Sequence, residues 1–171
     1  MTERTIYLAG GCFWGVERYI GMIPGVLDTS VGYANGNAER VTYEQVCQHD
    51  TGHAETVRVV FDSDALPLQR LLSLFFDVID PTSVNRQGND VGTQYRTGVY
   101  YEDDALLPEI TAAMDALRRQ TNAPIAVEVL PLRQYCDAEE YHQDYLSKNP
   151  GGYCHIDVTA FIRLAAKLRT L

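Results

Sequence analysis

The sequence lacks several features that would define its class at once. It has no run of about 20 apolar residues, so we expect no transmembrane helix. It has no internal repeat, low-complexity tract or linker, so its 171 residues are expected to form a single domain, 1–171. The N-terminus lacks the charged, apolar and small-residue segments of a signal peptide, which predicts a cytoplasmic protein.

Positive charge and cysteine are also scarce. There are 14 Lys and Arg against 23 Asp and Glu, and the net charge of −9 argues against a nucleic-acid or anionic-membrane partner. The four cysteines (Cys12, Cys47, Cys136 and Cys154) are widely and irregularly spaced. That spacing excludes a disulfide framework and includes no Cys-x-x-Cys pair, so the cysteines are catalytic, metal-binding or simply buried.

The hydrophobic pattern predicts alternating strands and helices. Strands are expected over 5–9, 26–34, 55–61, 98–101 and 125–132, and helices over 16–22, 67–79, 103–117, 138–146 and 161–168. The stretches 41–51 and 81–92 are expected to be irregular. This order predicts an α+β fold, a two-layer α/β sandwich of the ferredoxin-like plait type, with long coil segments and a flexible C-terminal tail.

One stretch, Gly-Gly-Cys-Phe-Trp-Gly over 10–15, follows the first strand and precedes the first helix. Its thiol, Cys12, is therefore expected beside the unpaired N–H groups of a helix start, which favour a thiolate. Phe13 and Trp14 would form an apolar wall beside the sulfur. The alternative is that Cys12 is a small buried hydrophobe and the two rings are core residues. This stretch alone does not decide between them.

Three further stretches contain side chains with acid, hydroxyl or thiol chemistry. Glu55 begins a strand after Gly-His-Ala, Asp90 and Tyr95 lie in a glycine-containing loop, and Cys154 follows a Gly-Gly pair. Each also has an ordinary structural explanation. Glu55 could be an exposed edge carboxylate, Asp90 a turn former, Tyr95 a core residue and Cys154 an idle thiol.

Taken together, these stretches resemble one family, the class A peptide-methionine sulfoxide reductases, which reduce the S epimer of methionine sulfoxide. The matching stretches occur in the family's order and span nearly the whole chain: GGCFWG at 10–15, TYEQVC at 42–47 with Tyr43, GHAE at 52–55, QGNDVGTQYR at 87–96, AEEYHQDY at 138–145 and NPGGYC at 149–154. The resemblance therefore implies a catalytic domain with an α/β plait and long coil segments.

The resemblance assigns Cys12 as the nucleophile that attacks the sulfoxide sulfur and Glu55 as the acid that protonates the sulfoxide oxygen. To hold a proton near neutral pH, Glu55 needs a raised pKa. Burial against Phe13 and Trp14 would raise it, and so would the nearby Cys12 thiolate. The two rings are also expected to bind the substrate's S-methyl group.

The resemblance further implies that Tyr43 and Tyr95 donate hydroxyl hydrogen bonds to the sulfoxide oxygen and that Asp90 orients a donor or a water. Cys154 is the resolving cysteine, which condenses with the Cys12 sulfenic acid to a disulfide that thioredoxin reduces. No bound cofactor or metal is implied. The expected substrates are free methionine sulfoxide and oxidised proteins, which makes this a repair enzyme. It is expected to act as a monomer with no nucleic-acid or membrane partner.

Two departures from the family pattern concern cysteines. No cysteine follows Cys154, so no second thiol relay is available at the C-terminus. Cys136 occupies a stretch where family members commonly have an aromatic-aromatic-Pro sequence. We interpret Cys136 as a structural thiol, with an alternative resolving role as the less favoured interpretation, and Cys47 as a buried residue.

Two rival functions remain open at this point. A hydrolase or acyltransferase with a cysteine–histidine pair would place a histidine within hydrogen-bond reach of Cys12. A metal-binding module would gather scattered Cys and His residues, namely Cys47, His49, His53, Cys136, Cys154 and His155.

Overall fold

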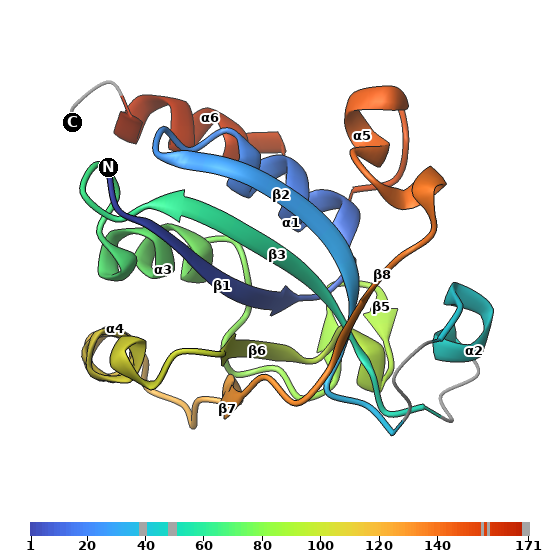
Figure 1. Cartoon of the computed structure of the whole chain (residues 1–171), viewed down its shortest axis with the longest axis horizontal. Coiled ribbons are helices and arrows are strands. Elements are labelled where there is room, and N and C mark those ends of the chain that lie inside the picture. Colours follow the sequence, from blue (N-terminus) through green and yellow to red (C-terminus); the bar gives the residue numbers. More distant parts are fainter. Residues whose placement is uncertain (38–40, 48–50, 155, 157, 169–171) are drawn as a thin grey trace.

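A curled six-stranded sheet forms the centre of the computed structural model, which describes residues 1–37, 41–47, 51–154, 156 and 158–168 (Figure 1). The strand order is β7-β6-β1-β3-β2-β8. All neighbouring strands are antiparallel except β6 and β7, which are parallel. The strands are β1 (Glu3–Gly10), β2 (Val26–Ala34), β3 (Ala54–Asp62), β6 (Thr97–Tyr101), β7 (Glu128–Pro131) and β8 (Tyr135–Asp137).

Helices connect and flank these strands, and the fold is therefore of the mixed α/β class. The α-helices are α1 (Phe13–Gly21), α2 (Tyr43–Cys47), α3 (Leu68–Phe76), α4 (Leu107–Gln120), α5 (Tyr145–Lys148) and α6 (Val158–Leu168). The described residues also form the 3-10 turns η1 (Thr93–Tyr95), η2 (Asp104–Leu106) and η3 (Glu140–His142), and a separate hairpin pairs β4 (Arg86–Gln87) with β5 (Asp90–Val91). In the described part of the chain, no helix combines the length and apolar character needed to cross a bilayer.

The central strand β1 is buried on both of its faces. Ile6 and Leu8 belong to the main core, together with apolar side chains of α1, α3 and α4. Tyr7 and Ala9 point the other way, into a smaller cluster with Ala34, Ala54 and Tyr100. Each fully buried large apolar side chain contributes about 1.5–3 kcal/mol. The end of β1, from which Cys12 follows, is therefore held from two sides.

The long periodic elements confirm the sequence prediction, whereas several short ones do not. The strand expected over 26–34 has those bounds, and the helix expected over 67–79 is present as the shorter α3. The single helix expected over 138–146 is wrong, because Asp144 adopts a left-handed φ of 52° and separates η3 from α5. The strand expected over 125–132 begins only at Glu128. Helix α2 and strand β8 were not predicted, since such short elements show too few periods.

Candidate active site

Cys12 lies at the corner between β1 and α1, where two glycines make a tight turn possible. Gly11 has a φ of 92°, a left-handed conformation that favours glycine. A Cβ placed on Gly10 would lie 2.8 Å from Phe75 Cε1 and 2.9 Å from Ile79 Cγ2. The turn before Cys12 thus packs directly against the end of α3 and the residues that follow it. This places the buried thiol at the start of α1, as the sequence predicts.

The thiol of Cys12 is not acidified, so the sequence prediction of a lowered pKa is wrong. The backbone N–H of Trp14 does donate to the sulfur and favours the thiolate, as expected for a helix start. Burial outweighs this donor and raises the pKa of the Cys12 thiol well above its ordinary value, and the Glu55 carboxylate raises it further. In the unliganded site Cys12 is therefore a neutral thiol at pH 7.

Glu55 reaches the same corner from β3 and is only 1% exposed. Its Oε1 accepts a hydrogen bond from the Phe13 backbone N–H at 3.3 Å. Its Oε2 is buried and has no hydrogen-bond partner within the described residues. Burial raises the pKa of Glu55 to about 8, the negative charge of Asp90 adds to this, and the Phe13 N–H opposes it. The raised pKa is as predicted, but the neighbouring charge that acts on Glu55 is Asp90 rather than a Cys12 thiolate.

Two tyrosines and an aspartate approach Glu55 from other elements. Tyr43 on α2 and Tyr95 on η1 are half-buried, and burial together with the Glu55 charge raises the pKa of both hydroxyls, so both remain donors at neutral pH. The Tyr43 hydroxyl forms a hydrogen bond with the thiol of Cys47, which is half-buried rather than buried. Asp90 on β5 acts electrostatically on Glu55, Cys12 and Tyr95.

The two aromatic residues after Cys12 have different environments. Phe13 is buried against Tyr33, with ring centroids 5.7 Å apart. Trp14 keeps part of its surface accessible and stacks on Tyr145 at 3.8 Å with 12° between the planes. Its indole N–H donates to His142 Nδ1 at 3.0 Å. Trp14 is therefore the member of the pair that combines an accessible surface with a fixed orientation.

The second thiol, Cys154, is also close to the site. It is half-buried, donates to the Ile156 carbonyl at 3.5 Å, and acts electrostatically on Cys12. The preceding Tyr153 donates its hydroxyl hydrogen to Asp90 Oδ2 at 3.1 Å. This bond ties the segment before Cys154 to the β4–β5 hairpin. All four cysteines are free thiols.

Glu139, which no sequence motif marks as a candidate site residue, accepts several hydrogen bonds beneath the site. Its carboxylate accepts from the Tyr33 hydroxyl at 3.3 Å, the Tyr43 backbone N–H at 3.2 Å and the Tyr141 hydroxyl at 3.1 Å. It thereby joins β2, α2 and the segment around η3. Glu139 lies within the stretch 138–145 that carries the family resemblance, and this stretch is the signal that could have identified it.

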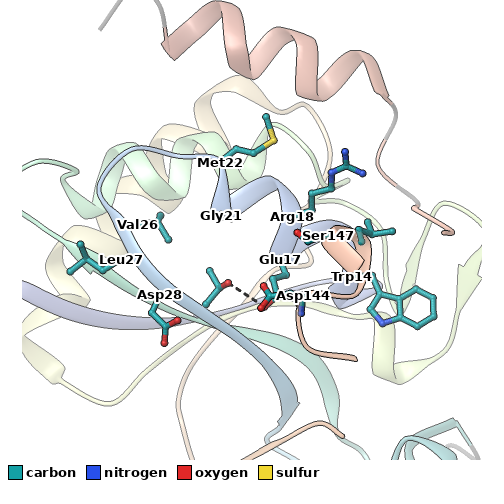
Figure 2. A pocket seen from close by; sticks show the side chains of 12 residues that line it. Trp14, Glu17, Arg18, Gly21, Met22, Val26, Leu27, Asp28, Asp144 and Ser147 are labelled. Atoms are coloured by element: carbon teal, nitrogen blue, oxygen red, sulfur yellow. Dashed lines mark hydrogen bonds between the residues drawn. The ribbon is translucent and has the colours of Figure 1, made fainter. Parts of the chain in front are cut away.

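A separate cavity of about 500 Å³ adjoins Trp14 on the side of α1 that faces the start of β2 (Figure 2). Glu17, 4% exposed, lies in its wall. Glu17 Oε1 accepts from the Asp144 backbone N–H at 2.8 Å and Oε2 accepts from the Thr29 hydroxyl at 3.1 Å. Burial raises the pKa of Glu17 to about 7. Cys12 and Glu55 do not line this cavity.

The environment of the Cys12 sulfur does not favour the rival functions. Within the described residues, the groups that act on the sulfur are the Trp14 N–H and the side chains of Glu55, Asp90 and Cys154. His142 uses Nδ1 to accept from Trp14. Among the described residues there is no group of three or more His, Cys, Asp or Glu side chains that could hold a metal. Two residues of the metal hypothesis, His49 and His155, lie outside the described residues.

Comparison with known proteins agrees with this geometry. Residues 4–169 match the family described as peptide methionine sulfoxide reductase. The chain is 57% identical over 159 residues to the peptide methionine sulfoxide reductase MsrA of Lachnoclostridium phytofermentans, covering 93% of this chain and 96% of the relative. It is similar to the crystal structure of reduced Mxr1 from Saccharomyces cerevisiae, with a TM-score of 0.84, 40% identity, and coverage of 89% and 88% of the two chains. The same yeast protein in complex with Trx2 matches with a TM-score of 0.60 and 27% identity, over 84% of each chain.

Proposed function

The chain belongs to the peptide methionine sulfoxide reductase family, and we propose that its reaction takes place between Cys12 and Glu55. It is an oxidoreductase that reduces methionine sulfoxide to methionine, with the S epimer as substrate. The observation that carries the proposed roles is a buried carboxyl, with a pKa of about 8, whose charge acts on a buried thiol. One group can supply a proton and the other an electron pair.

In the first step, the Cys12 sulfur attacks the sulfoxide sulfur while Glu55 gives its proton to the sulfoxide oxygen. The carboxylate left on Glu55 takes the proton of the Cys12 thiol, assisted by the Trp14 N–H that stabilises the developing thiolate. As the protonated oxygen moves to the Cys12 sulfur, the substrate's sulfur–oxygen bond and the new sulfur–sulfur bond both break, which leaves a Cys12 sulfenic acid and releases methionine. Atoms balance, because one thiol and one sulfoxide give one sulfenic acid and one sulfide.

The remaining site residues bind the two ends of the sulfoxide group. Tyr43 and Tyr95 donate hydrogen bonds to the oxygen as charge develops on it, and Asp90 orients this network. The role of the two tyrosines is supported because both hydroxyls remain protonated at neutral pH and interact electrostatically with Glu55. Phe13 and Trp14 contact the S-methyl group, which is selected by shape and dispersion rather than by hydrogen bonds.

In the second half of the reaction, the Cys154 thiol condenses with the Cys12 sulfenic acid to a disulfide and releases one water. The proximity of the two thiols supports this role, since the Cys154 side chain interacts electrostatically with Cys12. A reduced thioredoxin then exchanges its dithiol for the Cys12–Cys154 disulfide and restores both thiols. The complex of the yeast relative with Trx2 supports thioredoxin as the electron donor. No bound cofactor or metal takes part.

We further propose a ferredoxin-like plait for the centre of the fold. The order β6-β1-β3-β2, antiparallel throughout, with α1 between β1 and β2 and α3 between β3 and β6, supports it. The chain is proposed to be a single catalytic domain over 1–171 and a cytoplasmic monomer. It acts on free and protein-bound methionine sulfoxide and has no nucleic-acid or membrane partner, in keeping with its net charge of −9.

A thiol count after one equivalent of substrate tests this function. Methionine-(S)-sulfoxide should consume two of the four thiols and yield a Cys12–Cys154 disulfide in the peptide map. The R epimer should leave all four thiols free. A Cys12–Cys136 disulfide would move the resolving role to Cys136, and four remaining thiols after treatment with the S epimer would contradict the proposed function.

A further inference from the structure

Three tyrosines around the site converge on one carboxylate, that of Glu139. Its Oε1 accepts from the Tyr33 hydroxyl at 3.3 Å and from the Tyr43 backbone N–H at 3.2 Å, and its Oε2 accepts from the Tyr141 hydroxyl at 3.1 Å. Oε2 also lies 3.4 Å from the Tyr43 nitrogen, so this N–H points between the two oxygens. The proposed reaction gives this carboxylate no role, although it bonds directly to a residue that the reaction uses.

Helix α2 depends on contacts outside itself for its position. It has five residues, little more than one turn, and so short a helix is not stable alone. Thr42 and Gln45 cap it reciprocally, with N–H to side-chain oxygen distances of 2.9 and 3.2 Å, which holds the turn together but does not place it in the molecule. Val46 packs into the main core. Within the described residues, the hydrogen bonds that join α2 to the rest of the chain run from the Tyr43 N–H to Glu139.

The residue held in this way carries the hydroxyl proposed to bind the sulfoxide oxygen. The Tyr43 hydroxyl interacts electrostatically with Glu55 and Tyr95, and the Tyr43 ring centroid lies 4.7 Å from that of His142. A tyrosine side chain has only two rotatable bonds, so a fixed backbone and a packed ring leave its hydroxyl little freedom. A displacement of about 1 Å at a reacting group can lower a rate about 10²-fold. The position of α2 therefore matters for the reaction.

We propose that Glu139 is a positioning residue, which holds α2 by the Tyr43 backbone N–H and so places the Tyr43 hydroxyl against the sulfoxide oxygen. The inference rests on the proposed function for the role of that hydroxyl, whereas the anchoring of α2 does not depend on it. Charge develops on the oxygen in the transition state, so the hydroxyl bond is strongest there. A misplaced Tyr43 therefore lowers the first-turnover rate more than it weakens substrate binding.

Two substitutions at position 139 separate the acceptor from the charge. Glu139→Gln keeps one oxygen for the Tyr43 N–H, and its amide nitrogen then faces the Tyr141 hydroxyl, which can turn to accept. Glu139→Ala removes both acceptors. Tyr141→Phe is a matched control that removes a different donor to the same carboxylate. Glu140→Ala is a second control, because it removes the adjacent carboxyl, which is 89% exposed and pairs with Lys148.

The first-turnover rate of reduced enzyme with saturating methionine-(S)-sulfoxide is the primary measurement. Glu139→Ala should lower this rate about tenfold, and the substrate concentration at half-saturation should change less. Glu139→Gln should keep the rate within about twofold of wild type, because the conservative variant retains the acceptor, and both controls should do the same.

Removing either proposed donor hydroxyl tests whether the effect passes through Tyr43. In a Tyr43→Phe background, Glu139→Ala should lower the rate by less than about twofold, because no hydroxyl is left to misplace. In a Tyr95→Phe background the oxygen depends on Tyr43 alone, so the loss should exceed that seen with both tyrosines present. His142 Nε2 lies 3.8 Å from Glu139 Oε2, and an effect passing through His142 would instead give the same loss in all three backgrounds.

Hydrogen exchange of the Tyr43 amide, followed by NMR, gives a readout that needs no turnover. This amide should exchange about tenfold faster in Glu139→Ala than in wild type and at about the wild-type rate in Glu139→Gln and Tyr141→Phe. Should the Ala variant not fold, Glu139→Asp draws the carboxylate back by one methylene. It should show the same faster exchange and the same dependence of the rate on Tyr43.

Three results would overturn the role of Glu139. They are an equal loss of rate in the three backgrounds, a loss in Glu139→Gln as large as in Glu139→Ala, and an unchanged exchange rate of the Tyr43 amide. If the wild type itself fails to reduce methionine sulfoxide, the proposed function falls, whereas the exchange data still decide whether Glu139 holds α2.

Discussion

Two buried glutamates are associated with the same helix: Glu17 is part of α1, and Glu55 on β3 accepts a hydrogen bond from its first residue. Of the two, Glu55 is the one with an oxygen left for a reaction within the described residues. Burial raises the pKa of both carboxyls, Glu17 to about 7 and Glu55 to about 8. Glu17 uses both oxygens, one for the Asp144 backbone N–H and one for the Thr29 hydroxyl. Glu55 uses one oxygen for the Phe13 N–H, and its buried Oε2 has no partner within the described residues.

The difference shows that a raised pKa does not identify a catalytic acid by itself. Both carboxyls are protonated to a large extent near neutral pH, but Glu17 joins α1 to β2 and to the segment before α5, which is a structural role. Glu55 can donate its proton to an incoming group because its second oxygen is not committed. The neighbouring Cys12 thiol provides the nucleophile of the reaction in which this proton is transferred.

The largest loss of activity is expected when the sulfur next to Glu55 is removed. Cys12→Ser should reduce sulfoxide turnover to background, since a serine hydroxyl at this position is neither ionised nor able to form a sulfenic acid. Methionine released from methionine-(S)-sulfoxide measures the effect. Cys136→Ser, at a half-buried cysteine on β8, is the control and should retain full activity. Residual turnover in the Cys12 variant would exclude it as the nucleophile.

The two carboxyls are compared directly by the same isosteric change at each. Glu55→Gln should lower the first-turnover rate by about 10²–10³, because the amide cannot supply the proton to the sulfoxide oxygen. Glu17→Gln should leave that rate within about threefold of wild type, because its bonds lie outside the reacting groups. Rapid-quench measurement of methionine formed by reduced enzyme gives both values. Equal rates in the two variants would remove Glu55 from the acid role.

The pH dependence of the first turnover reports the protonation of Glu55. The proposed step needs both the Glu55 proton and the Cys12 proton, so the first-turnover rate should be constant below about pH 7 and fall as pH rises through about 8. Above that pH the loss should approach tenfold per unit, and Glu55→Gln should lack this alkaline decline. A rate that instead rises up to pH 8 and then stays level would show that the transition state carries only one of the two protons.

The smallest expected effect is on the stability of the fold and concerns Glu17. Glu17→Gln should lower the free energy of unfolding by about 1 kcal/mol at pH 5, because an acceptor oxygen becomes a donor at one of its two bonds. The folded pKa of Glu17 is raised to about 7 from 4.5, so its contribution is fully present below pH 4.5 and lost as pH rises through 7. Urea unfolding at pH 5 and pH 8 should therefore show a larger difference between the variant and wild type at pH 5. An equal difference at both values would contradict the raised pKa.

Much of this molecule was predictable from its sequence because long periodic elements and ordered motifs determine it. Strand β3 shows its alternation directly, and the motif around Cys12 places a thiol at a strand-to-helix corner. The protonation state of Cys12 was not predictable, since burial against distant residues outweighs the local helix-start donor. The elements between 135 and 148 were also missed, because a left-handed Asp144 and contacts from three other elements, rather than periodicity, determine their course.

The missing side chain at Gly10 has a consequence for engineering this enzyme. Its backbone lies so close to Phe75 and Ile79 that even a methyl group there would have to displace these two side chains. The distance between the reacting corner and its apolar support is thus adjustable from residues that have no chemical role. Smaller side chains at 75 or 79 would give a directed-evolution library a way to loosen or retune the nucleophile's position without replacing any reacting group.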